Sequence, residues 1–159
     1  MSIECPPQKQ SITPHQPDAN ALLPEWVEWF WAAFLPAWIN RARDTQGYGF
    51  FDLLDENAQA TEQNRRTVLA QARLLFTFSH LALTSNKPIY MEAARVARDA
   101  LSIFRKEPGL YCRARTRSGE PTGDVNDDLA LSYDQSFVIL GLSTWSQLNI
   151  NDNVDSELE

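Results

Sequence analysis

The most regular hydrophobic pattern of this chain runs from Asn64 to Leu83. Its apolar positions recur every three or four residues, the spacing that gathers side chains on one face of an α-helix. A second, partly apolar stripe carries Arg73, so the helix is expected to be buried on several sides. A charge in that setting is costly unless it is paired or faces a polar cavity. The first stripe consists of Val68, Ala72, Leu75, Phe76, Ser79 and Leu83, and the second of Leu69, Arg73, Phe76 and His80.

The same periodicity predicts three further helices. One begins near Pro24, which suits a first helical turn, and ends at residues 40–44, with Pro36 kinking or dividing it. Another starts between Asn86 and Pro88 and runs to about Lys106, and the last is capped among residues 126–128 and runs to about Leu148. The side chains expected to face inward are Trp26, Trp29, Phe30, Ala33 and Ala37, then Ile89, Ala93, Val96, Ala97, Ala100, Ile103 and Phe104, and finally Leu129, Tyr133, Phe137, Leu140 and Thr144.

Extended structure is predicted only in short pieces. Residues 110–117 alternate between two sets of side chains, as a strand does, and aromatic residues flank Gly47 and Gly49 in a second extended segment. These pieces cannot build a central sheet. The predicted fold is therefore all-α, made of paired antiparallel helices with short extended turns or a β-hairpin at one end.

Composition and charge narrow the class of protein. The chain has 159 residues and a net charge of -7, and an acidic protein lacks the basic face that nucleic-acid binding needs. No segment approaches the roughly 20 apolar residues of a membrane span, and the first ten residues do not resemble a signal peptide, so a soluble cytoplasmic protein is expected. Cys5 and Cys112 have no metal or redox spacing and are expected to be reduced.

Four short motifs resemble the N-acylglucosamine 2-epimerase superfamily, which includes mannose isomerases and cellobiose 2-epimerases. They occur in the family's order and approximate spacing over about residues 24–148. The motifs are Phe34-Leu35-Pro36-Ala37-Trp38, Gly47-Tyr48-Gly49-Phe50, Gln71-Ala72-Arg73 followed by Phe78-Ser79, and Tyr133-Asp134-Gln135-Ser136-Phe137.

The resemblance implies an (α/α)6 barrel with a sugar site at one mouth. This chain would supply its first part over residues 21–150, between a loose arm (1–20) and an acidic tail (151–159). The family's chemistry removes the proton at C2 of an open-chain aldose and stabilises an enediolate, without a metal or cofactor. By motif match, Arg73 is the cation beside the oxyanion and Tyr133 contacts the monosaccharide or disaccharide substrate, while Trp38 is expected at the rim.

The catalytic histidines of the family have no counterpart among the predicted helices. His15 lies in the arm, and His80 is two turns from Arg73, about 10 Å along the helix axis. The resemblance thus implies a sugar isomerase or epimerase, with mannose–fructose conversion favoured, that is incomplete as this chain.

Several alternatives remain open from the sequence. Arg73 bridging Asp134 would be a structural ion pair, Tyr133 on an apolar face would be core, and Arg113, Arg115 and Arg117 form either an anion-binding strip or a solvated face. Asp52, Asp55, Asp127 and Asp128 suggest a glycoside hydrolase, which uses two carboxylates and is also built on (α/α)6 barrels. A non-catalytic helical fragment or interaction protein would leave apolar helix faces uncovered and self-associate through them.

Overall fold

The computed structural model describes residues 19–61 and 63–148, which form parts of two units, Met1–Leu35 and Pro36–Glu159. The boundary between the units falls inside the predicted partial barrel, residues 21–150. The predicted arm lies outside the described residues except for Ala19 and Asn20, and the acidic tail, His15 and Cys5 lie wholly outside them. No helix within the described ranges is long and apolar enough to cross a membrane.

The first unit contains one helical stretch with an irregular end. Helix α1 spans Ala19–Trp29 and continues into a π-helical turn, Phe30–Phe34. The helix therefore begins five residues before the predicted Pro24. The predicted distortion near Pro36 occurs one turn earlier, as expected when a proline removes an amide donor and crowds the carbonyl of the preceding turn.

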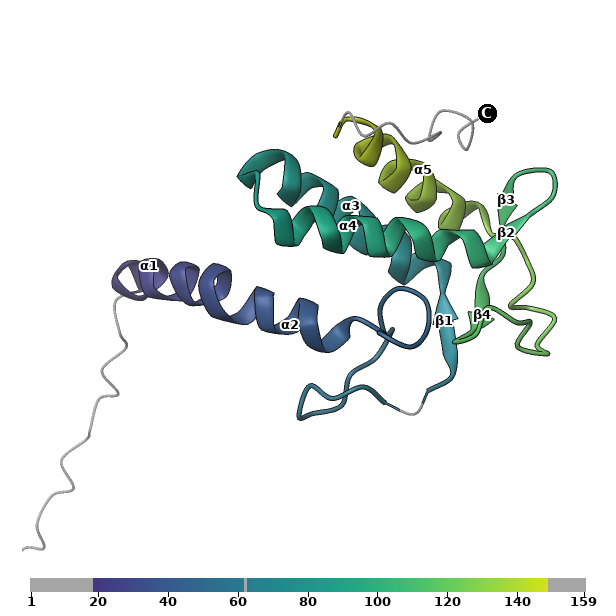
Figure 1. Cartoon of the computed structure of the whole chain (residues 1–159), viewed down its shortest axis with the longest axis horizontal. Helices are drawn as coiled ribbons and strands as arrows, with labels where there is room; N and C mark the ends of the chain where they lie inside the picture. Colours follow the sequence, from purple (N-terminus) through teal and green to yellow (C-terminus); the bar gives the residue numbers. More distant parts are fainter. Residues whose placement is uncertain (1–18, 62, 149–159) are drawn as a thin grey trace, which may run out of the picture. The chain divides into compact units, whose positions relative to one another are not determined.

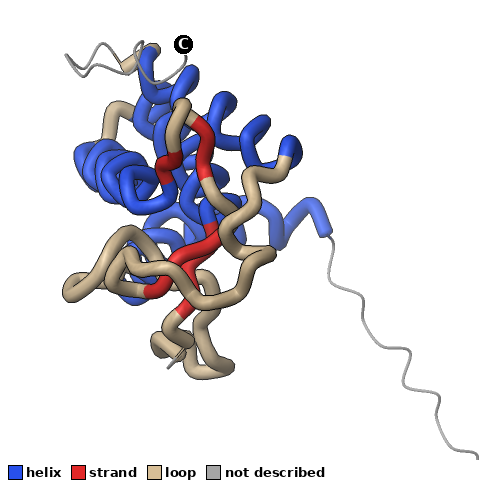
Figure 2. The backbone as a smooth tube through the Cα atoms, turned by 90° about the vertical axis from the view of Figure 1, so that its right-hand side faces the viewer, coloured by secondary structure: helices blue, strands red, loops and turns tan. Residues whose placement is uncertain are grey.

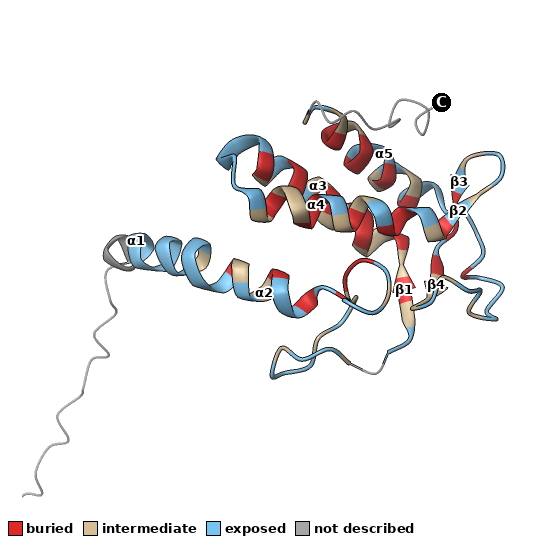
Figure 3. Cartoon of the chain, in the orientation of Figure 1, coloured by how far each residue is buried: buried red, intermediate tan, exposed pale blue. Residues whose placement is uncertain are grey.

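The tryptophans of α1 are not core residues, contrary to the prediction. Trp26 and Trp29 are 62% and 48% exposed. Their rings contact each other edge to face, with centroids 5.2 Å apart, and Trp29 also lies 5.2 Å from Phe34. The apolar residues spaced along this helix therefore form an exposed aromatic cluster (Figure 3).

The second unit consists of helices with short strands at one end (Figures 1 and 2). Helix α2 (Leu35–Ala42) begins at the unit boundary, and α3 (Val68–Ser85) packs against both α4 (Pro88–Ala100) and α5 (Ser132–Ser146). A 3-10 turn, Leu101–Phe104, extends α4. The predicted all-α architecture of helical hairpins is confirmed.

The strands lie where α3 and α5 begin (Figure 1). Strands β2 (Arg105–Lys106) and β3 (Leu110–Tyr111) form an antiparallel hairpin. Strand β1 (Arg65–Thr67) pairs antiparallel with β4 (Ala114–Thr116), about 50 residues later, with Arg66 opposite Arg115. This pairing joins the start of α3 to the segment that leads into α5.

The core lies between α3, α4 and α5. Gly141 of α5 is packed so closely on α3 that an added Cβ would lie 2.9 Å from the carbonyl oxygen of Ala72. The glycine therefore sets the short spacing between these two helices. The buried apolar side chains of these helices are Val68, Ala72, Leu75, Phe78 and Ala82 of α3, Tyr90, Ala93, Ala94, Ala97 and Ala100 of α4, and Val138, Leu142 and Trp145 of α5.

Three predicted helix boundaries need correction. The central helix begins at Val68 rather than Asn64, because residues 65–67 pair with β4 and Thr67 accepts a hydrogen bond from the Ala70 amide as the N-cap. The third helix ends at Ala100 rather than Lys106. The last begins at Ser132 rather than among residues 126–128, because the Asp127 carboxylate is bound by Arg65 and Thr122 and does not cap a helix.

Candidate functional site

Arg73, in the second turn of α3, meets Tyr133, in the first turn of α5. The Arg73 Nη2 atom donates a hydrogen bond of 2.8 Å to the Tyr133 hydroxyl. The guanidinium also lies over the Phe137 ring, 4.6 Å from its centroid, in a cation–π contact. Both Arg73 and Tyr133 are exposed, so the pair offers a cation and a phenol to a ligand.

Arg73 lies in a different setting from the buried one expected. Its side chain is exposed, and it binds the Tyr133 hydroxyl and not the Asp134 carboxylate, the partner in the alternative that the sequence left open. Asp134 is 4% exposed, and its buried Oδ2 atom has no hydrogen-bond partner. Burial raises the pKa of Asp134 above its ordinary value, while the charges of Arg113 and Arg73 counteract part of this effect.

The face of α5 that carries Tyr133 is exposed, whereas the sequence predicted it to be core. Tyr133, Leu140 and Leu129 are 58%, 41% and 51% exposed, and of the predicted inward stripe only Thr144 is buried. On α3, Leu83 is also exposed, and Phe76 stacks on the exposed His80 with centroids 6.2 Å apart. Arg73 and Tyr133 therefore lie on a largely apolar face formed by two neighbouring helices.

Gln71 anchors the first turn of α3 to an extended segment. Its Oε1 atom accepts from the Phe50 amide at 3.0 Å, and its Nε2 atom donates to the Phe50 carbonyl at 2.9 Å. Gly49 has a φ of +68, and any Cβ there would collide with the Gln71 amide. Gln71 and Gly49, both in the quoted motifs, thus fix the helix turn that carries Arg73.

Gln135 makes the same connection at the start of α5. Its Oε1 atom accepts from the Tyr111 amide at 3.0 Å, and its Nε2 atom donates to the Tyr111 carbonyl at 2.7 Å. Each site residue is therefore two positions from a glutamine that binds a main-chain amide and carbonyl. The sequence analysis missed both glutamines, although their equivalent places in two motifs were a usable signal.

Comparison with known proteins identifies the family to which this arrangement belongs. The family model for N-acylglucosamine 2-epimerase (GlcNAc 2-epimerase) matches residues 49–157, more than half of the chain. The chain belongs to the N-acylglucosamine 2-epimerase family. No curated protein matches its sequence.

Solved structures similar to this family member have the same helical fold. Cellobiose 2-epimerase from Spirochaeta thermophila DSM 6192 is 20% identical with a TM-score of 0.70, over 92% of this chain and 35% of that protein. Cellobiose 2-epimerase from Bacillus thermoamylovorans B4167 is 19% identical with a TM-score of 0.73, over 87% and 35%. A D-mannose isomerase is 22% identical with a TM-score of 0.68, over 88% and 33%. The chain thus has the fold of part of an (α/α)6 barrel and spans about a third of the length of these structures.

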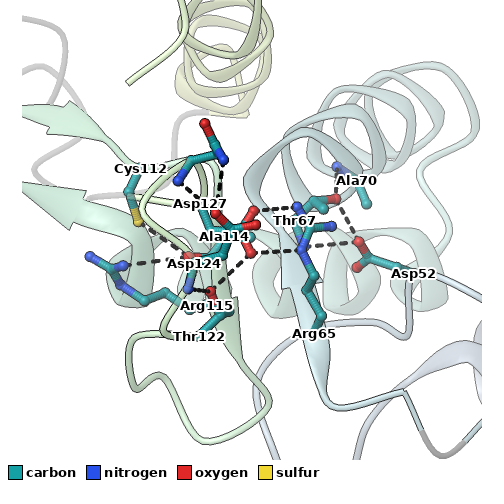
Figure 4. A network of polar contacts seen from close by, with 11 residues as sticks. Asp52, Arg65, Thr67, Ala70, Cys112, Ala114, Arg115, Thr122, Asp124 and Asp127 are labelled. Carbon is teal, nitrogen blue, oxygen red and sulfur yellow. Dashed lines mark hydrogen bonds and ion pairs between the residues drawn. The ribbon is translucent and has the colours of Figure 1, made fainter. Parts of the chain in front are cut away.

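A polar network joins β1, β4 and the segment before α5 in this family member (Figure 4). Arg65 binds Asp127 through two hydrogen bonds of 2.6 and 2.9 Å, and Thr122 donates to the same carboxylate at 2.9 Å. The bond from Arg65 is the largest influence on the pKa of Asp127, which is lowered to about 2. Asp52 accepts from the Thr67 amide and hydroxyl, and its burial raises its pKa. These contacts hold the residues on which α3 begins.

A buried carboxylate links the loop after α2 to both β1 and β4. Asp44 accepts hydrogen bonds from Arg66, at 3.0 Å, and from Arg117. Burial alone would raise its pKa, but bonds from Arg117, the Gln46 amide and Arg66 outweigh that effect and lower the pKa to about 2. The buried arginine of this fold is therefore Arg66, whose guanidinium also lies 4.4 Å from the centroid of the Phe51 ring.

The remaining candidates lie away from the Arg73–Tyr133 pair or are paired elsewhere. Trp38 is half-buried and packs on Phe50 and Phe78, with centroids 6.2 and 6.3 Å away. At 3.6 residues per turn, Phe78 and Arg73 point in directions about 140° apart around α3. Trp38 therefore packs against a different side of α3 from the one that carries Arg73.

The acidic residues considered for glycoside hydrolysis are largely bound by partners. Asp127 pairs with Arg65, Asp128 pairs with Lys106 and Arg115, and Asp55 accepts from the amides of Asn57 and Gln59. Within the described ranges, no cluster of three or more His, Cys, Asp or Glu side chains could hold a metal ion.

Proposed function

We propose that this chain carries the sugar-binding and oxyanion-stabilising part of a sugar isomerase or epimerase site, with mannose as the favoured sugar. The observation that carries the proposal is the 2.8 Å bond between Arg73 and Tyr133, which fixes an exposed guanidinium between two helix starts. A fixed cation stabilises the negative oxygen that develops when a proton leaves C2 of an aldose. Membership of the N-acylglucosamine 2-epimerase family supports this chemistry.

Each residue has a separate role in this proposal. Arg73 binds the oxygen of the open-chain sugar and stabilises the enediolate form of that oxygen. Tyr133 donates a hydrogen bond to a sugar hydroxyl, while the adjacent Phe137 ring offers an apolar surface to the C–H face of the sugar. Return of the proton to C1 gives the ketose, and its return to the opposite face of C2 gives the epimer.

The test combines ligand binding and proton exchange in one NMR sample. The purified chain is mixed in D2O with mannose, glucose, N-acetylmannosamine and cellobiose. Saturation transfer from protein to sugar reports binding, and loss of the C2 proton signal reports turnover. We expect saturation of mannose by the wild-type chain and by Arg95→Ala, a control at an exposed arginine of α4.

Arg73→Ala is expected to remove the binding signal, because the variant lacks the guanidinium and leaves Tyr133 unheld. Exchange at C2 that depends on Arg73 would show that the chain also turns the sugar over. Equal binding by wild type and Arg73→Ala, or no binding of any sugar by a folded wild-type sample, would refute the proposal. Far-UV circular dichroism verifies the fold of each variant.

A further inference from the structure

Arg113 is a second arginine without a carboxylate partner among the described residues, and its main chain is held at the starts of the two helices that carry Arg73 and Tyr133. Arg113 lies two residues after the end of β3, and its main chain bonds to the start of α3 and to the segment that precedes α5. Its carbonyl accepts from the Val68 amide, the first residue of α3, at 3.0 Å, and its amide donates to the carbonyl of Leu129, just before α5, at 2.9 Å. The main chain of Arg113 therefore lies between the starts of the two helices that carry Arg73 and Tyr133.

The side chain of Arg113 differs from those of its neighbours along the chain. Arg115 pairs with Asp128 at 3.0 Å, and Arg117 pairs with Asp44. The exposed side chain of Arg113 has no hydrogen bond or ion pair with any residue in the described ranges. Of the three arginines that suggested an anion-binding strip in the sequence, the structure leaves this one available.

The surroundings of Arg113 favour a negative group. The charges of Arg113 and Arg73 both lower the pKa of the buried Asp134 carboxyl group against the effect of burial, so both guanidiniums act on the same region at the start of α5. Arg113 also acts electrostatically on Asp127, but that carboxylate already binds Arg65. The N-cap residue of α5, Leu131, provides no side-chain cap, and the amides of an uncapped first turn add partial positive charge.

We propose that the site accepts a sugar bearing a phosphate or a carboxylate, and that Arg113 binds this anionic group. This inference rests on the proposed function, since it specifies the substrate class of the same site. Arginine suits both groups because its planar fork of donors matches two oxygens of a phosphate or carboxylate. In this arrangement Arg113 binds the anion, and Arg73 and Tyr133 remain on the sugar oxygens.

The test compares four ligands by saturation transfer and titration at low salt: mannose, mannose 6-phosphate, glucuronate and inorganic phosphate. We expect the wild-type chain to bind at least one of the two anionic sugars about tenfold or more tightly than mannose, as one charge-assisted hydrogen bond would provide. Preference for mannose 6-phosphate or for glucuronate identifies the anion. The preference should fall as salt rises from about 0.05 to 0.5 M.

Arg113→Gln is expected to abolish the preference while leaving mannose binding unchanged, and Arg113→Lys should keep part of it. Arg95→Gln, an exposed arginine of α4 paired with Glu92, is the matched control and should behave as wild type. Mannose binding with no gain from either anion would overturn this inference and leave the proposed function standing. Inorganic phosphate binding as tightly as the anionic sugars would overturn it too, and absence of all sugar binding would overturn both proposals.

Discussion

Replacing Asp44 by Asn should destabilise the second unit strongly and in a pH-dependent way. The Asp44 carboxylate is fully buried and holds Arg66, whose side chain is 1% exposed. Asn cannot neutralise that guanidinium, and removing one partner of a buried ion pair costs about 3–5 kcal/mol. The lowering of the Asp44 pKa from 3.8 to about 2 corresponds to a stabilisation by the charged form of about 2–3 kcal/mol at pH 7.

The sign of the pH dependence follows from this lowered pKa. A carboxylate whose pKa is lower in the folded state stabilises the protein fully above its unfolded pKa, near 4. That stabilisation is lost as the pH falls through the folded value, near 2. We expect the contribution of the charge to shrink to about half by pH 3, so the stability gap between wild type and Asp44→Asn should narrow there without closing.

Urea unfolding followed by circular dichroism at pH 7, 5, 4 and 3 measures this gap. Asp99→Asn is the control, because Asp99 is a carboxylate with a 60% exposed side chain and should change stability by less than about 0.5 kcal/mol. A loss of less than about 1 kcal/mol for Asp44→Asn at pH 7 would refute the reasoning. So would a gap of the same size at pH 3 and pH 7.

Three other substitutions test the packing and the site. Gly141→Ala should destabilise the chain in urea, because the added Cβ would lie 2.9 Å from the Ala72 carbonyl oxygen. Overpacking of the α3–α5 contact costs about 1–3 kcal/mol, and the better helix propensity of alanine returns about 1 kcal/mol. A more stable variant would contradict this. Gln135→Leu should speed hydrogen exchange of the Tyr111 amide while leaving the Phe50 amide protected, and equal acceleration of both would indicate general unfolding instead. Tyr133→Phe should keep stability within about 0.5 kcal/mol, because its side chain is 58% exposed, yet weaken sugar binding measured by saturation transfer; unchanged binding would remove Tyr133 from the site.

The helices of the second unit could be predicted from periodicity, but the orientation of α5 could not. The stripe of Tyr133, Phe137 and Leu140 was chosen as core, whereas Val138, Leu142 and Trp145 are buried. Both faces of α5 are apolar, so the spacing of hydrophobic residues does not tell which face meets α3. Gly141 was the discriminating residue, since a close helix contact needs a glycine on the packed side.

The ends of the helices were mispredicted because they depend on contacts between distant residues. Aspartate is a favoured N-cap residue, but the carboxylate of Asp127 binds Arg65, which is 62 positions away in the sequence. Likewise, residues 65–67 continue a helical pattern but pair with β4. Local propensity is a weak preference that a long-range ion pair or strand pairing overrides. The motif order nevertheless singled out Arg73 and Tyr133, which the structure brings to hydrogen-bond distance.

The two glutamines explain why the candidate site lies at the most constrained part of α3 and α5. A site residue near the middle of a long helix is positioned only by packing, but Arg73 and Tyr133 are each two residues from a side chain that binds both main-chain groups of an extended segment. The Asp52–Thr67 bond adds a third constraint at the start of α3. Rigid placement of this kind reduces the entropy lost when a ligand binds. The apolar face beside the pair is exposed to water, which lowers the stability of the isolated chain. The same exposure leaves the Arg73–Tyr133 pair accessible to a ligand.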